Sequence, residues 1–216
     1  PNSTGMFLDY QNLFGYPYGF FGGYDSFQGG DWGGNMFLSR FPFGAEVFFL
    51  GEKSAIRAKV VLPIKTLYLD IIHPSESWPE QEKIKLLEPL LALRKDPYIL
   101  TGDFNSLSHR DCYNKEILFQ ELLSLGEFSN FQICSYIDEK LSCAFISWLS
   151  SQGIKDTLKN GSSTIPTTLK WGKPVYGMRI DYCFTSGLHV LDAYVVRNQY
   201  TELASDHYPV VSILEF

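Results

Sequence analysis

The chain has 216 residues, of which 18 are basic and 24 acidic, giving a net charge of −6 at neutral pH. Hydrophobic residues make up 45% and charged residues 19%, a composition that excludes an intrinsically disordered chain. The acidic balance argues against broad, salt-driven binding of nucleic acid, although a local basic groove is compatible with it. No apolar run is long enough to span a membrane and no signal peptide is visible, so we expect a soluble, intracellular protein.

The first fifty residues are rich in aromatic side chains and glycine. They hold 15 of the 34 Phe, Tyr and Trp residues and 10 of the 18 glycines, with no lysine and one arginine, Arg40. We expect a short helix around Thr4–Phe14, followed by turns and short extended pieces, because Gly and Pro interrupt residues 15–24. The segment is either an aromatic-packed edge of the core or an exposed aromatic surface for bases, lipid or a partner.

The middle of the chain alternates between strand and helix patterns. Runs rich in β-branched and aromatic residues predict strands, and apolar residues spaced by three and four predict one amphipathic helix. The expected strands are Met36–Ser39, Glu46–Leu50, Ala55–Leu62, Thr66–Ile72 and Pro97–Thr101, and the expected helix is Pro79–Arg94.

The second half continues the mixture. The expected helices are Lys115–Leu125 and Leu141–Ser151, and the expected strands are Met178–Thr185, His189–Val196 and Tyr208–Leu214. Because the sequence contains no repeat, low-complexity linker or charge block, we expect residues 1–216 to form a single domain. Helices that must pack on a sheet imply a layered α/β architecture.

The four cysteines show no metal-binding or disulfide pattern. Cys112, Cys134, Cys143 and Cys183 form no CxxC pair and have no paired histidines. This spacing argues against a zinc site and against a disulfide scaffold. We expect these cysteines to be small buried hydrophobic residues in a reduced compartment.

The most informative string is Leu100-Thr101-Gly102-Asp103-Phe104-Asn105, in which a buried strand runs into a glycine. In an extended chain, positions two apart share one face, so Asp103 and Asn105 point out of the strand end together. A carboxylate beside an amide is suited to hold and polarise a water molecule. The structural alternative is an Asp/Asn turn cap.

Three further strings carry polar groups at strand ends: Arg179-Ile180-Asp181-Tyr182, Ser205-Asp206-His207-Tyr208 and Ile72-His73-Pro74. A carboxylate in an apolar strand, such as Asp181, is costly to bury unless it is paired. His207 needs an orienting acceptor before it can donate to an anion, and Asp181 is a candidate for that acceptor. The alternative for His207 is a hydrogen-bonded structural histidine.

Together with Gly34-Asn35-Met36-Phe37-Leu38-Ser39-Arg40, these strings resemble the endonuclease/exonuclease/phosphatase superfamily, from about Gly33 to Phe216. The resemblance implies a four-layered α/β sandwich of two mixed β-sheets flanked by helices, with a metal site at one end. It implies divalent-metal-dependent hydrolysis of phosphate ester bonds, of the phosphodiesterase/nuclease or phosphatase class, by attack of water on phosphorus.

The resemblance also implies a role for each residue. Asp103 would orient or deprotonate the attacking water, and Asn105 would position the water or the phosphate. His207, held by Asp181, would donate to a phosphate oxygen, while His73 would contact the phosphate or assist the leaving group. The implied metal ligands are Asp206, Asp103 and Asn105, whose hard oxygen atoms favour Mg²⁺ or Mn²⁺ over zinc.

Two features of the superfamily are not found in this sequence. Its members begin with a strand carrying an asparagine and a second strand carrying a metal-binding glutamate, whereas Glu46 and Glu52 follow the Gly34-Asn35 string. We therefore expect an N-terminally incomplete domain. The alternative is a catalytically inactive binding module that lacks the metal-anchoring glutamate.

The substrate is less well defined by the sequence. It is a phosphate ester, either nucleic acid or a small or lipid-linked phosphodiester, and the lysine-free aromatic segment slightly favours the latter. Positive charge around a groove could come from Lys53, Arg57, Lys59, Lys170, Lys173 and Arg179, and His109 is a further candidate substrate contact. The alternative for most of these residues, and for His109, is a solvated position on the surface. Acyl or peptide hydrolysis finds no support, since neither Gly-x-Ser-x-Gly nor His-Glu-x-x-His occurs.

Overall fold

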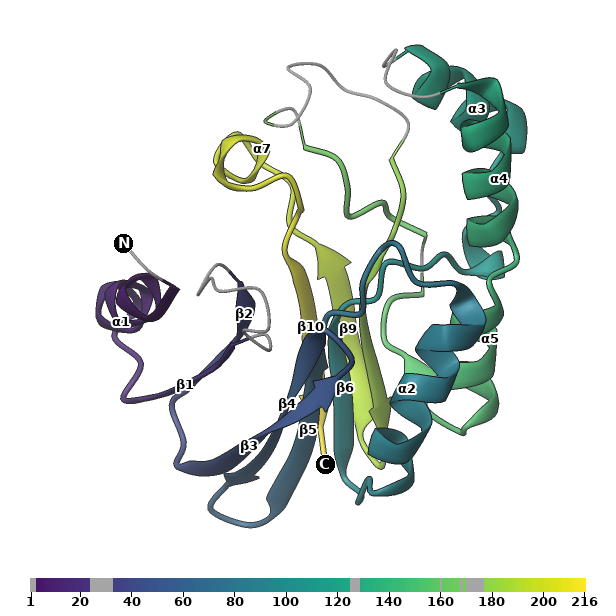
Figure 1. Ribbon diagram of the computed structural model, residues 1–216. Coiled ribbons are helices and arrows are strands. Elements are labelled where there is room, and N and C mark those ends of the chain that lie inside the picture. The colour runs from purple at the N-terminus through teal and green to yellow at the C-terminus, as the bar shows by residue number, and fades with distance from the viewer. Residues whose placement is uncertain (1–2, 24–32, 125–128, 160, 168, 170–176) are drawn as a thin grey trace.

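The computed structural model describes the chain except for residues 1–2, 24–32, 125–128, 160, 168 and 170–176. Its centre is a six-stranded mixed sheet with the strand order β3-β4-β5-β6-β8-β7 (Figure 1). The strands are β3 (Phe43–Leu50), β4 (Lys53–Val61), β5 (Thr66–Ile72), β6 (Tyr98–Asp103), β7 (Lys155–Asp156) and β8 (Asp181–Ser186). β5 and β6 run parallel, and β6 and β8 run antiparallel.

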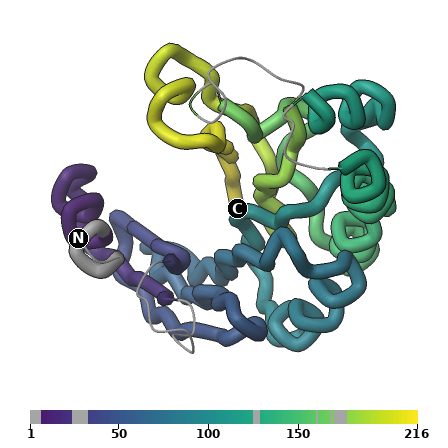
Figure 2. The backbone as a smooth tube through the Cα atoms, turned by 45° about the horizontal axis from the view of Figure 1, so that its top comes forward, coloured from purple at the N-terminus to yellow at the C-terminus, as the bar shows by residue number. Residues whose placement is uncertain are grey.

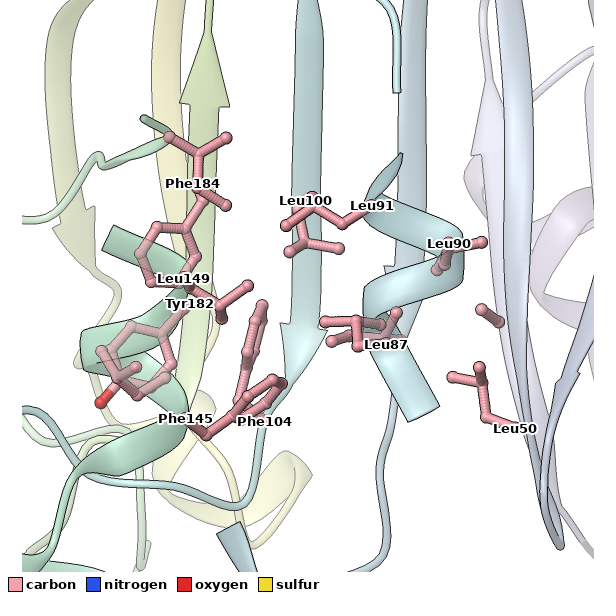
Figure 3. Packing of buried hydrophobic residues seen from close by; sticks show 14 of the residues in the cluster. Leu50, Leu87, Leu90, Leu91, Leu100, Phe104, Phe145, Leu149, Tyr182 and Phe184 are labelled. Atoms are coloured by element: carbon pink, nitrogen blue, oxygen red, sulfur yellow. The ribbon is translucent and has the colours of Figure 1, made fainter. Parts of the chain in front are cut away.

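Helices α2 (Glu80–Ala92) and α5 (Ala144–Ser151) cover one face of this sheet. The largest apolar cluster fills the space between them and the sheet, as Figure 3 shows for Leu87, Leu100, Phe104, Phe145 and Tyr182. Phe104 is fully buried there, with its ring 5.3 Å from that of Tyr182 and 6.0 Å from that of Phe145. The residue between Asp103 and Asn105 therefore anchors the end of β6 in the core.

Two antiparallel strand pairs lie on the opposite face: β1 (Tyr18–Gly23) with β2 (Gly34–Ser39), and β9 (His189–Val195) with β10 (Val210–Glu215). Asn35 Nδ2 donates to the Ser54 carbonyl of β4 at 2.7 Å. Ser212 of β10 is hydrogen-bonded to Thr157, beside β7 and β8, at 2.8 Å. In Figure 2 the β1–β2 pair, near the purple end of the chain, and the β9–β10 pair, near the yellow end, lie apart from each other.

Helix α1 (Ser3–Phe14) lies outside the β1–β2 pair, where Phe7 packs 6.2 Å from Phe21. The order is helices, six-stranded sheet, strand pairs and outer helix, which confirms the predicted four-layered α/β sandwich. In the part of the chain that the structure describes, the second β-layer is made of two antiparallel pairs. The single-domain organisation stays a prediction.

The remaining elements are α3 (Lys115–Ser124), α4 (Asn130–Leu141), α7 (Thr201–Ala204) and a short 3₁₀ helix (His109–Asp111). The sequence analysis missed α4, which begins with a capping box in which the Ser129 side chain and Gln132 exchange hydrogen bonds. The helix expected from Leu141 begins only at Ala144, because Cys143 takes a left-handed conformation with φ of 49°. No helix among the described residues is long and apolar enough to cross a membrane.

The prediction that all four cysteines are buried is wrong for two of them. Cys143 and Cys183 are buried, but Cys112 is exposed at the end of the 3₁₀ helix and Cys134 is exposed on the surface of α4. The aromatic N-terminal segment divides between both alternatives. Its described residues include the packed Phe37 and Phe43 pair, 4.7 Å apart, and the exposed Phe14.

The sheet topology brings three polar strand ends to one edge. His73 follows the end of β5, Asp103 ends the parallel strand β6, and Asp181 begins the antiparallel strand β8. Gly102 makes the close approach of β5 and β6 possible, since it has φ of 137° and an added Cβ would lie 1.9 Å from the Ile72 carbonyl oxygen.

Two arginines that were candidates for a positive groove form ion pairs within the fold. Arg179 is 1% exposed and lies between Asp111, at 3.0 Å, and Asp156, at 2.7 Å. Arg57 forms a two-point ion pair with the fully buried Asp70, with its shorter distance 2.7 Å. The prediction is therefore wrong for the buried Arg179, whereas the half-buried Arg57 stays a candidate.

Arg179→Met should lower the free energy of unfolding by about 3–5 kcal/mol, because it leaves two buried carboxylates without their cation. Urea unfolding followed by tryptophan fluorescence measures this loss. Lys115→Met, which removes the cation of the exposed Lys115–Asp138 pair, is the control and should leave the midpoint nearly unchanged. Equal effects of the two substitutions would contradict a structural role for Arg179.

Candidate active site

A pocket of about 460 Å³ opens at the edge where β5, β6 and β8 bring their polar residues together. Its lining includes five residues that the sequence analysis had singled out for catalysis or metal binding: His73, Asp103, Asn105, Asp206 and His207. The sixth, Asp181, contacts the pocket through its hydrogen bond to His207. Residues separated by more than 130 positions in the chain therefore meet at one site.

Asp103 and Asp181 face each other directly across the β6–β8 ladder. Burial raises the pKa of Asp103 to about 7, and the charge of Asp181 adds to this effect. The backbone N–H of Asn105 donates to Asp103 Oδ1 at 2.8 Å and partly offsets the increase. A carboxyl group with a pKa close to neutral pH is well matched to exchange a proton with water.

His207 is oriented by Asp181. Its Nδ1 lies 2.9 Å from Asp181 Oδ2, which leaves Nε2 as the ring nitrogen available toward the pocket. Burial alone would lower the pKa of His207, but the hydrogen bond and the charge of Asp181 outweigh burial, so the pKa is raised. The imidazole is therefore held in one orientation and favoured in its protonated form.

His73 approaches Asp103 from the end of β5, with Nε2 3.4 Å from Asp103 Oδ2. Burial lowers the pKa of His73, and the charges of Lys53 and His207 lower it further. The pKa values of the two histidines of the pocket are thus shifted in opposite directions, down at His73 and up at His207. Such a divergence is typical of sites that need one proton acceptor and one proton donor.

Asn105 closes the turn after Asp103 in a left-handed conformation with φ of 49°. Its side-chain Nδ2 donates to the Pro74 carbonyl at 3.0 Å, which ties this turn to the loop after His73. Its own carbonyl accepts from the ammonium groups of Lys83 and Lys140, at 2.7 and 2.5 Å. The turn that carries Asp103 is therefore fixed on three sides.

The site offers oxygen-rich ligands for a divalent ion. Among the described His, Cys, Asp and Glu residues, Asp103, Asp181 and His207 have ligand atoms within 4.8 Å of one another. A cation there would relieve the repulsion between the two carboxylates, so these residues fit a hard ion such as Mg²⁺ or Mn²⁺. Of the predicted ligands, Asp103 belongs to this group, while Asn105 and Asp206 line the same pocket.

Sequence reasoning missed three ionisable residues of the described pocket lining, Glu76, Tyr136 and Lys140. Tyr136 donates to Glu76 Oε1 at 3.0 Å, and burial together with the charge of Lys83 lowers the pKa of Lys140 to about 8. Glu76 has a weak signal in the sequence, since it follows His73 by three residues. Tyr136 and Lys140 belong to α4, the helix that the sequence analysis did not predict.

Other sequence candidates lie elsewhere. Lys53 lines the pocket, whereas Lys59 lines a second pocket of about 510 Å³ toward the opposite end of the sheet. His109 is exposed in the 3₁₀ helix and is not part of the described lining of the site. Lys170 and Lys173 lie outside the described residues.

Comparison with known proteins shows which family and fold this chain matches. Residues 3–207 match the model of the endonuclease/exonuclease/phosphatase family. An endonuclease/exonuclease/phosphatase from Beutenbergia cavernae superposes with a TM-score of 0.63 at 21% identity, over 96% of this chain and 55% of that chain. This chain therefore spans about half the length of that protein. No curated protein sequence matches it significantly.

Two further solved structures share the fold. A 3′ phosphatase from Neisseria, bound to a product DNA hairpin, has a TM-score of 0.64 at 16% identity, over 100% of this chain and 86% of that chain. A mannosyl-6-phosphatase from Bacteroides thetaiotaomicron has a TM-score of 0.56 at 16% identity, over 99% of this chain and 82% of that chain. At these identities the likeness is one of fold.

Asp181→Asn should lower the pKa of His207 by about one pH unit or more, because the charged acceptor is lost while burial remains. It should also lower the pKa of Asp103, since a like charge is removed from the opposite strand. An NMR titration of the imidazole and carboxyl signals measures both, with the exposed His189 as the internal reference. An unchanged or higher pKa of His207 would disprove the orienting role of Asp181.

Proposed function

The chain belongs to the endonuclease/exonuclease/phosphatase family, and from this premise we propose that it hydrolyses phosphate ester bonds by metal-dependent attack of water on phosphorus. The observation that carries the proposal is the convergence of Asp103, Asp181 and His207 with His73 at one pocket. A phosphate ester is anionic, so its hydrolysis needs charge neutralisation and in-line positioning more than it needs a strong base.

We assign the attacking water to Asp103. Its carboxyl group has a pKa close to neutral pH, lies in the pocket and is oriented by the Asn105 amide. Asp103 would hold the water in line with the phosphorus–leaving-group bond and take its proton. Asn105 would help to position the same water or a phosphate oxygen through its side-chain amide.

We assign to His207 the positive charge that stabilises the phosphate during attack. With Nδ1 bonded to Asp181, the protonated ring presents Nε2–H to a non-bridging phosphate oxygen, where negative charge increases during attack. His73 lies on the Asp103 side of the pocket, where it would contact the phosphate or assist the leaving group. These two histidines would then act on different oxygens of the phosphate.

A bound Mg²⁺ or Mn²⁺ would supply Lewis-acid neutralisation of the phosphate charge. Asp103, Asn105 and Asp206 are the proposed ligands, and Asp181 adjoins Asp103 in the same group. The carboxylates provide the ligand oxygen atoms, and a bound cation would relieve the repulsion between them. Asp103 would be shared between the ion and the water.

Small phosphate esters fit the site better than a long tract of nucleic acid. In the described part of the pocket, the lysines are Lys53 and Lys140. Arg179 is engaged in buried ion pairs, and the half-buried Arg57 is paired with Asp70 away from this pocket. Neighbours of the same fold are a 3′ phosphatase bound to product DNA and a mannosyl-6-phosphatase. We therefore propose a compact phosphate ester, with a nucleic-acid end as the competing substrate.

Asp103→Ala and His207→Ala should each lower kcat by about 10²–10⁴-fold, because each removes a proton-transfer or charge-stabilising group. Assays with 4-nitrophenyl phosphate and bis(4-nitrophenyl) phosphate, with Mg²⁺ or Mn²⁺ at defined salt, measure the effect. Asp192→Ala and His189→Ala on the exposed positions of β9 are the matched controls. Turnover that survives both site substitutions in folded protein would refute the assignment, and a folded wild type without turnover would favour the inactive binding module.

Hydrolysis in ¹⁸O-labelled water should place the label in the phosphate product, because water attacks phosphorus and not the carbon of the ester. Mass spectrometry of the released phosphate measures the incorporation. Chelation of the divalent ion should stop incorporation, and added Mg²⁺ or Mn²⁺ should restore it. Label found in the alcohol product would contradict the proposed route.

A further inference from the structure

Two ammonium groups meet at one carbonyl oxygen beneath the pocket. Lys83 reaches the Asn105 carbonyl from α2, and Lys140 reaches it from α4, so both lone pairs of this oxygen accept from a cation. Lys83 is 1% exposed and Lys140 is 4% exposed. Burying two ammonium groups at one place opposes folding unless each charge is compensated.

Lys83 is compensated. Its Nζ lies 3.0 Å from Glu80 Oε1, which also accepts from Ser106 Oγ at 2.6 Å, while Glu80 Oε2 accepts from the Phe145 backbone N–H at 3.1 Å. Lys83 also donates to Ser106 Oγ at 2.8 Å. Its three donors thus have partners, one of which is a buried carboxylate with satisfied oxygens.

Lys140 forms no such hydrogen bond with a carboxylate among the described residues. Its hydrogen bonds go to two backbone carbonyls, those of Asn105 and Glu76, the second at 3.3 Å, and the ring of Tyr136 lies 5.4 Å from its Nζ. Burial and the charge of Lys83 lower the pKa of Lys140 to about 8, although the charges of Glu80 and Glu76 raise it. The fold thus disfavours the ammonium form, so a contribution to stability does not account for it.

We propose that Lys140 is a positioning residue for the turn that carries Asp103. Lys140 and Lys83 clamp the Asn105 carbonyl from two helices and thereby hold Asn105 in its left-handed conformation. In this conformation the Asn105 N–H points at Asp103 Oδ1 and its side chain bonds to Pro74, next to His73. The role in turnover rests on the proposed function, but the effect on the turn does not.

A positioning role for Lys140 has different measurable effects from a role in binding substrate or in stabilising the fold. A residue that positions Asp103 affects kcat, because the base is misplaced when the turn relaxes, and leaves KM nearly unchanged. A phosphate-binding lysine would instead raise KM. A structural residue would change stability and loosen exchange throughout the fold.

Lys140→Met keeps the length and apolar stem of the side chain and removes the ammonium group. We expect a urea midpoint at or above that of the wild type, a kcat lower by about ten- to a hundredfold and a KM within about twofold. Amide hydrogen exchange followed by NMR should speed up by at least about tenfold at Asn105 and Ser106, and not in the central strands.

Lys85→Met, on the exposed side of α2, is the matched control and should change neither kcat nor exchange at the turn. Lys140→Gln, which retains a shorter neutral donor, should lie between wild type and Lys140→Met in both readouts. It also gives a second variant if Lys140→Met folds poorly.

Three results would overturn the proposal: unchanged exchange at Asn105, a higher KM with unchanged kcat, or a lower midpoint with faster exchange in every strand. If the folded wild type hydrolyses no phosphate ester with Mg²⁺ or Mn²⁺, the proposed function fails by itself. Exchange at Asn105 in the Lys140 variants then still confirms or refutes the effect on the turn.

Discussion

The site is built around two carboxylates that the sheet forces to face each other. Asp103 and Asp181 are paired in register at the last position of the β6–β8 ladder, where like charges repel. The register is fixed from below, because a slip by one residue would turn Tyr182 and Phe184 out of the core. Packing of these apolar side chains therefore keeps Asp103 and Asp181 opposite each other despite their repulsion. The surrounding groups respond to this pair: His207 bonds to Asp181, His73 approaches Asp103, and a divalent ion would neutralise both.

Precision at the site comes from what surrounds the turn after β6. Gly102 lets β6 approach the Ile72 carbonyl. Phe104, which stands between Asp103 and Asn105 in the sequence, buries its ring in the core, and its N–H donates to the Ile180 carbonyl at 2.8 Å. The core thus holds the turn from one side, and the lysine clamp holds it from the other. Chemistry that depends on the direction of one carboxylate benefits from such a rigid support. The elements that carry these contacts come from both halves of the chain.

Much of this arrangement could be predicted from the sequence. Strong local patterns defined β5, β6 and α2 to within a few residues, and the strings around Asp103, Asp181 and His207 identified residues that meet in the pocket. What local patterns do not contain is strand register, so the direct opposition of Asp103 and Asp181 was not foreseen. Likewise Arg179 finds its partners Asp111 and Asp156 at separations of 68 and 23 residues, and only the fold shows that it is buried. Helix α4 was missed because its buried apolar positions, Ile133 and Ile137, are few, and Lys140 was missed with it.

The most direct test of the account is the position of Mn²⁺ in crystals of the protein, located by anomalous scattering. A peak is expected in the pocket at coordination distance from a carboxylate oxygen of Asp103, and it should be lost in Asp103→Ala crystals grown under the same conditions. A peak that stays in the variant, or that lies only at sites away from Asp103 and Asp181, would contradict the claim that these facing carboxylates are the centre of a metal-dependent phosphoesterase site.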